Sequence, residues 1–272
     1  MEHSFDICSI ANPCDTVNSS SLPDTFGVVL QARSRATRLP GKMTLPFYHE
    51  SGILQVVIEK TLKAFDKSRV VLATTDIDED DVLVDIAKTF GIGVYRGSES
   101  DVLQRFIECA RAFGFQHILR VCADNPFLRP EFMQSLVDSY FESPCDYHSY
   151  AFPDGTPTIR SHIGLFAEMV SMKALEDAAM QTDNPFYHEH VTNFVYSNEN
   201  VFRVKFKPLP QIVRHRKDIR LTVDTQTDFT IASALYALLK SGDDTLEALV
   251  NLVDQHPEYL NEMKQLISTY EK

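Results

Sequence analysis

Several features that mark other protein classes are missing from this sequence. No apolar run approaches the roughly 20 residues of a membrane-spanning helix. The five cysteines include no CxxC pair, which argues against a structural zinc site. Residues 1–26 contain no lysine or arginine, whereas a secretory signal starts with positive charge. We therefore expect a cytoplasmic protein that makes no membrane contact.

Positive charge is also scarce. The 272 residues carry 26 Lys plus Arg against 38 Asp plus Glu, a formal charge of −12. Such an acidic chain is not typical of a nucleic-acid binder. Yet the ten residues 33–42, RSRATRLPGK, hold four basic side chains and no acidic one. An acidic protein that concentrates its cations in this way is expected to bind a small anion there.

The pattern of apolar residues predicts the fold class. Apolar runs at 26–32, 69–75, 92–97 and 117–124 are typical of buried strands, and helical patterns follow at 52–65, 78–90, 100–113 and 131–141. Ser51 is the expected cap of the first helix. This alternation predicts βαβ units and a mostly parallel sheet.

The remaining segments show other patterns. We expect residues 1–26 to be a flexible extension and 27–272 to be one domain, with a small antiparallel insertion at about 147–217. Residues 219–239 are predicted to form a strand that ends at Asp224, then a helix. The tail from 245 is predicted to be helical, with Pro257 starting its last helix.

The topology of such a sheet brings three segments to one edge. Ligands lie at the carboxyl ends of parallel strands, so the loop after Ala32, the TTD at 74–76 and the ADNP at 123–126 are expected to meet. The basic loop fails the P-loop test, because no glycine opens it and Met43 follows Lys42. GIGVYRG at 91–97 fails the Rossmann pattern at Arg96. A solvated basic loop is the alternative to a phosphate site built on side chains.

Two aspartates each end a predicted strand, and they are the metal candidates. Mg²⁺ prefers one or two carboxylates plus substrate oxygens, and Asp124 and Asp224 are expected to meet at the ligand edge. The alternative is that each caps the helix that follows.

Three further groups have open roles. Ser98 could cap a helix or contact a base. His188 and His190 flank Glu189, but positions i and i+2 do not share a helix face, so this is no zinc motif. A substrate contact and a polar helix start are equally open for this segment. The RHRK cluster at 214–217 could face an anionic acceptor.

Taken together, the motifs resemble those of cytidylyltransferases. QARSRATRLPGK, VVLATTDIDED, YRGSESDVLQRF, RVCADNPFLRPE, YHEHVTNF and IRLTVDTQTDF stand in that family's order. The likeness is to the SpsF-like branch, related to the enzymes that make CMP-sialic acid and CMP-Kdo. It runs from about Gly27 to Leu239.

The resemblance implies a nucleotide-diphospho-sugar transferase fold of GT-A type, a Rossmann-like three-layer sandwich that is often a homodimer. It also implies roles for matching positions. Arg35, Ala36 and the stretch 161–166 depart from the pattern, and the last departure concerns the acceptor side. The implied nucleotide-binding positions are Ala32, Arg33, Arg38, Lys42, Thr74, Thr75, Ser98 and Asp124, with Asp124 and Asp224 as Mg²⁺ ligands.

The resulting hypothesis is a CTP-dependent nucleotidyltransferase of surface-glycan or related biosynthesis. An acceptor oxygen of a sugar, sugar acid, phosphate or phosphonate attacks the α-phosphorus, and pyrophosphate leaves. The predicted catalytic residues are Lys42, Arg33, Asp124 and Asp224. The predicted acceptor contacts are Arg35, Glu189, His190, Arg214 and Arg216.

Two alternatives stay open at this point. Asp76-x-Asp78 after an apolar strand is similar to the DxD motif of glycosyltransferases that use nucleotide sugars. The third hypothesis is a non-catalytic nucleotide-binding domain, which would bind CTP without consuming it.

Overall fold

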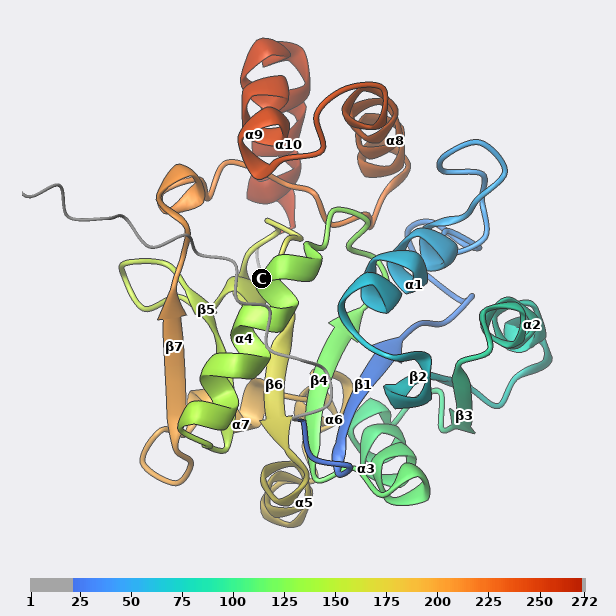
Figure 1. The fold of residues 1–272 in the computed structure, drawn as a ribbon, viewed down its shortest axis with the longest axis vertical. Helices are drawn as coiled ribbons and strands as arrows, with labels where there is room; N and C mark the ends of the chain where they lie inside the picture. The colour runs from blue at the N-terminus through green and yellow to red at the C-terminus, as the bar shows by residue number, and fades with distance from the viewer. Residues whose placement is uncertain (1–21, 271–272) are drawn as a thin grey trace, which may run out of the picture.

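A seven-stranded sheet forms the centre of the protein, whose computed structural model describes residues 22–270. The strand order is β3-β2-β1-β4-β6-β5-β7 (Figure 1). Among these strands only β6 runs antiparallel to its neighbours. The prediction of a mixed, mostly parallel sheet is confirmed. The strands are β1 (Phe26–Gln31), β2 (Val70–Thr75), β3 (Gly93–Gly97), β4 (His117–Cys122), β5 (Tyr147–Ala151), β6 (Glu168–Ser171) and β7 (Val204–Pro208).

Helices cover both faces of the sheet, which makes three layers. Residues of α1, α2 and α4 share one apolar core with α8, α9 and α10. Residues of α3, α5 and α7 share the second core on the other face. The helices are α1 (Ile53–Ala64), α2 (Asp81–Phe90), α3 (Val102–Phe113), α4 (Pro130–Glu142), α5 (Met172–Gln181), α6 (Pro185–Glu189), α7 (Asn193–Ser197), α8 (Gln226–Lys240), α9 (Leu246–Gln255) and α10 (Pro257–Thr269), with short 3-10 turns at Lys67–Arg69, Asp78–Asp80, Thr158–Arg160 and Gln211–Val213.

The four predicted strand–helix pairs of the first half are confirmed within a few residues. Gly91 and Gly114 end α2 and α3 with φ of +69° and +74°, as their positions predicted. The predicted cap Ser51 is wrong, because Gly52 is the cap of α1 and its backbone N–H donates to the Gln55 side chain at 2.7 Å.

The end of the predicted extension is held against the sheet. Arg69 donates to the carbonyls of Pro23 at 2.6 Å and Leu22 at 3.0 Å. Residues 1–21, for which flexibility was predicted, lie outside the described residues.

The segment 147–217 extends the main sheet, with only its middle strand reversed. β5 pairs in parallel with β7, and β6 lies between β4 and β5. A buried ion pair between Arg120 of β4 and Glu168 of β6 joins the reversed strand to the parallel part. Tyr147 and Thr192 donate further hydrogen bonds to Glu168. After α5 the chain forms two short helices, α6 and α7.

The strand order contains a topological switch point beside β1. The chain moves from β1 to β2 and β3 on one side, then returns to place β4 on the other side. The loops after β1 and β4 therefore separate at their shared edge, where ligands of such sheets bind. Helices α8, α9 and α10, the red end of the chain, lie beyond these carboxyl ends (Figure 1).

The predicted strand at 219–224 is wrong, because this segment joins no sheet ladder. Its backbone donors are satisfied across the edge instead. Leu221 and Thr222 donate to the carbonyl of His162 at 2.8 and 3.2 Å, and Val223 donates to the carbonyl of Asp124 at 2.9 Å.

A glycine makes this close crossing possible. Gly164 has φ of +63°, and a Cβ there would lie 2.8 Å from the backbone of Leu221 and Thr222. Only glycine tolerates both the backbone angle and the contact.

Candidate active site

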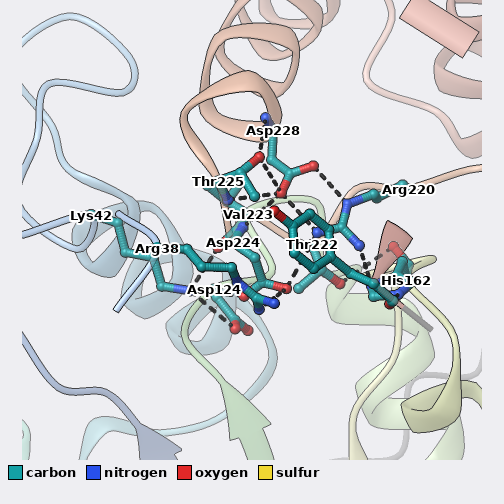
Figure 2. Close-up of polar contacts among 11 residues, drawn as sticks. Arg38, Lys42, Asp124, His162, Arg220, Thr222, Val223, Asp224, Thr225 and Asp228 are labelled. Carbon is teal, nitrogen blue, oxygen red and sulfur yellow. Dashed lines mark hydrogen bonds and ion pairs between the residues drawn. The ribbon is translucent and has the colours of Figure 1, made fainter. Parts of the chain in front are cut away.

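Lys42 lies between the two predicted metal ligands. Its Nζ donates to the Val223 carbonyl at 2.7 Å, to Asp224 Oδ1 at 3.2 Å and to Asp124 Oδ2 at 3.4 Å. Its side chain is only 8% exposed. The structure thus brings together three residues from the loop after β1, the loop after β4 and the segment before α8, as Figure 2 shows.

The alternative helix-capping roles of the two aspartates are wrong. Thr225 caps α8, and its side chain accepts from the Asp228 backbone N–H. Arg129 occupies the cap position of α4, the helix after Asp124.

The basic loop is a closed turn that carries Lys42 inward. Ser34 accepts backbone hydrogen bonds from Ala36 at 2.9 Å and from Gly41 at 3.1 Å, and Leu39 is buried. Gly41 has φ of +69°, and the chain turns at Pro40 and Gly41 just before Lys42. Ala32 is buried at the end of β1, where the loop starts.

A buried arginine and aspartate hold Asp224 in place, and the sequence analysis missed both. Arg220 donates to Asp228 Oδ1 at 2.7 Å and Oδ2 at 2.8 Å. Asp228 also accepts from the backbone N–H of Asp224 and Thr225 at 3.0 and 2.8 Å. An arginine within an apolar stretch and the Thr225-x-x-Asp228 capping pattern were the signals available in the sequence.

Three cations surround the Asp224 carboxylate. Lys42 contacts Oδ1, while Arg38 and Arg220 reach Oδ2 at 3.3 and 3.5 Å. In Figure 2, Lys42 and Arg220 approach Asp224 from opposite sides. Since Arg220 is neutralised by Asp228, Lys42 and Arg38 remain to balance Asp124 and Asp224.

The hydroxyls of Thr74 and Thr75 bind a carboxylate, whereas we predicted a nucleoside contact. Both residues are buried, and both donate to Oδ2 of buried Asp80. Asp80 Oδ1 accepts from the Ser34 backbone N–H at 2.6 Å. These threonines therefore support the basic loop through Asp80 and do not line the open edge.

We predict that Asp80 makes the protein sensitive to acid. Burial alone would raise the pKa of Asp80 above 3.8, but hydrogen bonds from Thr75, Thr74 and Ser34 outweigh it, so the pKa is lowered. A lowered folded-state pKa adds stability that is present above pH 3.8 and lost as the pH falls further. Asp80→Asn should lower the unfolding free energy by about 2 kcal/mol at pH 7 and flatten its decline in acid.

Urea unfolding at a series of pH values from 7 to 2.5 measures this. Asp78→Asn, at an exposed neighbour, is the control and should change the unfolding free energy by less than about 0.5 kcal/mol. Equal slopes for wild type and Asp80→Asn would refute the assignment.

Arg35 forms ion pairs, whereas we predicted an acceptor contact. It reaches Glu79 at 2.6 Å and Glu99 at 3.4 Å, on the loops after β2 and β3. Ser98 accepts from the Asp101 backbone N–H at 3.0 Å, so it serves the start of α3, where Asp101 is the cap. Of its two open roles, the structure supports the helix start.

The α6 region reaches the basic loop on one side. Glu189 lies 3.8 Å from Arg33, and both side chains are partly exposed. His190 packs against Phe186 at 4.6 Å between ring centroids. His188 contacts the Asp101 carboxylate at 2.8 Å, and the Thr182 carbonyl and this carboxylate raise its pKa. Glu189 and Arg33 are thus together at the open edge, while His188 fastens α6 to α3.

Acidic partners occupy two cations of the RHRK cluster at 214–217, for which an anionic acceptor stays a prediction. Arg216 is paired with Asp218 and with Asp254 of α9 at 2.9 and 2.7 Å. Lys217 contacts Asp154 at 2.5 Å. Exposed Arg214 lines a groove beside the ends of β5 and β7, with Phe152 and Lys207.

A small cavity with a mixed polar and apolar lining lies beside Asn125, the residue after Asp124. It is lined by Asn125, Ser161, Gly164, Glu168 and Thr222, among others. Asn125 is buried, and its Oδ1 receives no hydrogen bond from residues 22–270. A buried polar atom without a partner is rare in folded proteins, so Asn125 has bonding capacity for a ligand.

The donor set at this edge fits a hard divalent cation. Asp124 and Asp224 both face the Lys42 ammonium group, and Asp124 is a quarter exposed. Within the described residues no group of three or more His, Cys, Asp or Glu side chains could hold a metal. Two carboxylates with the remaining ligands from substrate and water are the set Mg²⁺ prefers.

The fold is of the α/β class, and Lys42, Asp124 and Asp224 meet at the switch point between β1 and β4. The sequence profile of the family described as Cytidylyltransferase matches residues 28–268. The chain therefore belongs to the cytidylyltransferase family.

Similarity to individual proteins supports the same family assignment. The chain is 31% identical to the spore coat polysaccharide biosynthesis protein SpsF of Bacillus subtilis over 242 residues, 86% of this chain and 96% of that protein. It is 32% identical over 120 residues, 42% of this chain and 46% of the relative, to the 3-deoxy-manno-octulosonate cytidylyltransferase of Aeromonas salmonicida. A solved cytidylyltransferase structure from Leptospira borgpetersenii superposes with a TM-score of 0.76 at 25% identity, covering 87% of this chain and 96% of that one.

Proposed function

We propose that the protein transfers a cytidylyl group from CTP to an oxygen of a small acceptor and releases pyrophosphate. The observation that carries this proposal is the convergence of Lys42, Asp124 and Asp224 at the switch point. Family membership supplies the nucleotide, and SpsF supports a place in polysaccharide biosynthesis.

The charges of the site support a triphosphate with a divalent cation. Lys42 and Arg38 balance Asp124 and Asp224 before any ligand binds. A cation held by the two carboxylates, for which we propose Mg²⁺, would add two positive charges and lower the repulsion between phosphate oxygens and protein. Arg33, on the same loop, adds a further positive charge.

The proposed reaction is an in-line displacement at the α-phosphorus. The acceptor oxygen forms a bond to this phosphorus, and the bond to the bridging oxygen of the β-phosphate breaks. The electron pair leaves with pyrophosphate, and the proton of an attacking hydroxyl would pass to a carboxylate of the site or to water. Lys42, Arg38 and Arg33 would stabilise the developing charge, which is electrostatic catalysis by preorganised donors. A bound Mg²⁺ would add charge neutralisation at the phosphates.

Asn125 places the acceptor in this proposal. It directly follows Asp124, and its side chain lines the small cavity between Gly164 and Glu168. A hydroxyl group both donates and accepts, so it satisfies the carboxamide in either orientation. We therefore propose that a hydroxyl of the acceptor binds Asn125, which favours a sugar or sugar acid among the expected classes.

The glycosyltransferase alternative has less support. Asp76 and Asp78 are exposed and follow β2, which borders β1 on the side opposite β4. The family assignment also favours nucleotidyl transfer. The experiment below distinguishes an enzyme from a domain that binds the nucleotide without catalysis.

A pyrophosphate-release screen tests the proposal. Each nucleoside triphosphate is combined with Mg²⁺ and a panel of sugars, sugar acids, sugar phosphates and phosphonates. We expect release with CTP and a hydroxyl-bearing acceptor, and no release without the divalent cation. Asn125→Ala should raise the KM of the acceptor and leave that of CTP unchanged. CTP binding without release for any acceptor would favour the non-catalytic alternative.

Two expectations accompany this function and stay predictions. They are the homodimer and the cytoplasmic location, for which light scattering and cell fractionation are the measurements. Within residues 22–270 no helix is long and apolar enough to span a membrane.

A further inference from the structure

The aromatic ring of Tyr270, just after α10, lies against two arginines of the site. The Arg38 guanidinium carbon is 4.8 Å from the ring centroid, and that of Arg220 is 5.8 Å away. Arg38 extends from this ring to Asp224, 3.3 Å from its Nη2. A residue about 230 positions from the basic loop thus touches the loop's most exposed phosphate-binding candidate.

The backbone of Tyr270 is bound to the scaffold that holds Asp224. Its carbonyl lies 2.7 Å from His162 Nε2, and His162 Nδ1 lies 2.6 Å from Arg220 Nη1. A carbonyl accepts only and an arginine donates only. His162 is therefore neutral in this arrangement, with its proton on Nε2. In Figure 2, His162, Arg220 and Asp228 form one connected series.

This series gives Arg38 a fixed support. The side chain of Arg38 is 44% exposed and belongs to an exposed turn, and the Tyr270 ring adds a second restraint to its ion pair with Asp224. A guanidinium that stacks on an aromatic ring uses its face for the ring and keeps its N–H edges for hydrogen bonds. The ring thus restrains Arg38 without competing for an anion.

We propose that Tyr270 is a positioning residue that holds the Arg38 guanidinium ready for the phosphate chain of the nucleotide. The proposal rests on the proposed function, because it takes CTP as the ligand. In this proposal Tyr270 does not touch the reacting atoms and acts only through Arg38. The carbonyl contact with His162 and the ring contact with Arg38 come from the same residue, which links α10 to the basic loop.

Calorimetric titration of CTP with Mg²⁺ into the full chain tests this without an acceptor. Tyr270→Ala should weaken CTP binding about fivefold, since cation–π contacts contribute about 1 kcal/mol. Tyr270→Phe keeps the ring and should bind as wild type does. Tyr270→Leu keeps apolar bulk without the ring and should resemble Tyr270→Ala, which separates the ring's role from helix packing.

A double-mutant cycle gives the sharper result. Arg38→Ala should weaken binding, and adding Tyr270→Ala to it should cause no further loss, because the ring acts through Arg38. Additive losses, or a Tyr270→Ala or Tyr270→Leu protein that binds CTP like wild type, would overturn the inference. A wild-type protein that does not bind CTP would instead overturn the proposed function, and this inference with it.

Discussion

Replacing Lys42 with alanine is expected to lower the rate of pyrophosphate release from CTP by about two to three orders of magnitude. Lys42 is the buried cation shared by Asp124 and Asp224, and its ammonium group also binds the Val223 carbonyl. The turn at Gly41 directs the chain inward and so carries Lys42 to this point. The loss should therefore appear mainly in kcat.

The same change has a second, independent signature. Without Lys42, two carboxylates face each other with less compensation, so a divalent cation should stabilise the variant more than the wild type. Thermal unfolding with and without Mg²⁺ measures this difference. Lys63→Ala, at an exposed position of α1, is the control and should match wild type in both assays. Unchanged turnover in Lys42→Ala would exclude the role given to the loop.

The largest effect on stability is expected from Asp228→Ala. Asp228 accepts two hydrogen bonds from buried Arg220 and two from the backbone N–H groups of Asp224 and Thr225. Removing one partner of a buried pair leaves an uncompensated charge and costs about 3–5 kcal/mol. The unfolding free energy from urea titration should fall by this amount.

Two comparisons make the Asp228 result specific. Asp177→Ala removes the surface pair with Lys173 on α5 and should cost less than about 1 kcal/mol. Asp228→Asn keeps the shape and should still lose most of the stability, because the charge is gone and two new donors face existing donors. An Asp228→Ala protein as stable as the Asp177→Ala control would contradict this account of the scaffold.

Structural features that depend on the local residue pattern were predicted correctly from the sequence. Gly91 and Gly114 ended their helices as expected, and the apolar runs marked β1 to β4. Topology correctly placed Asp124 at the ligand edge, because it follows the parallel strand β4. Asp224 reaches the same place for a different reason, since the segment before it is not a strand but crosses this edge, where Val223 donates to the Asp124 carbonyl.

Where the structure differs from the sequence predictions, the cause is a bonding partner that the local pattern did not show. The apolar stretch 219–223 has the pattern of a strand, but its donors bind the carbonyls of His162 and Asp124. Thr74 and Thr75 were predicted to bind the nucleotide, but in the structure their hydroxyls donate to Asp80. The acidic partners of Arg35 and Arg216 lie on other loops and helices. A side chain's type shows what it can bind, but the fold decides which partner reaches it.

The most direct measurement follows labelled phosphorus from CTP through one turnover, with an acceptor found in the release screen. Cytidylyl transfer predicts that an α-³²P label moves to the acceptor as a cytidine monophosphate ester and that a γ-³²P label appears in pyrophosphate. Mg²⁺ should be required, and Lys42→Ala should slow both products equally. An α label that stays in free nucleotide, or a γ label that moves to the acceptor, would contradict the function proposed for this site.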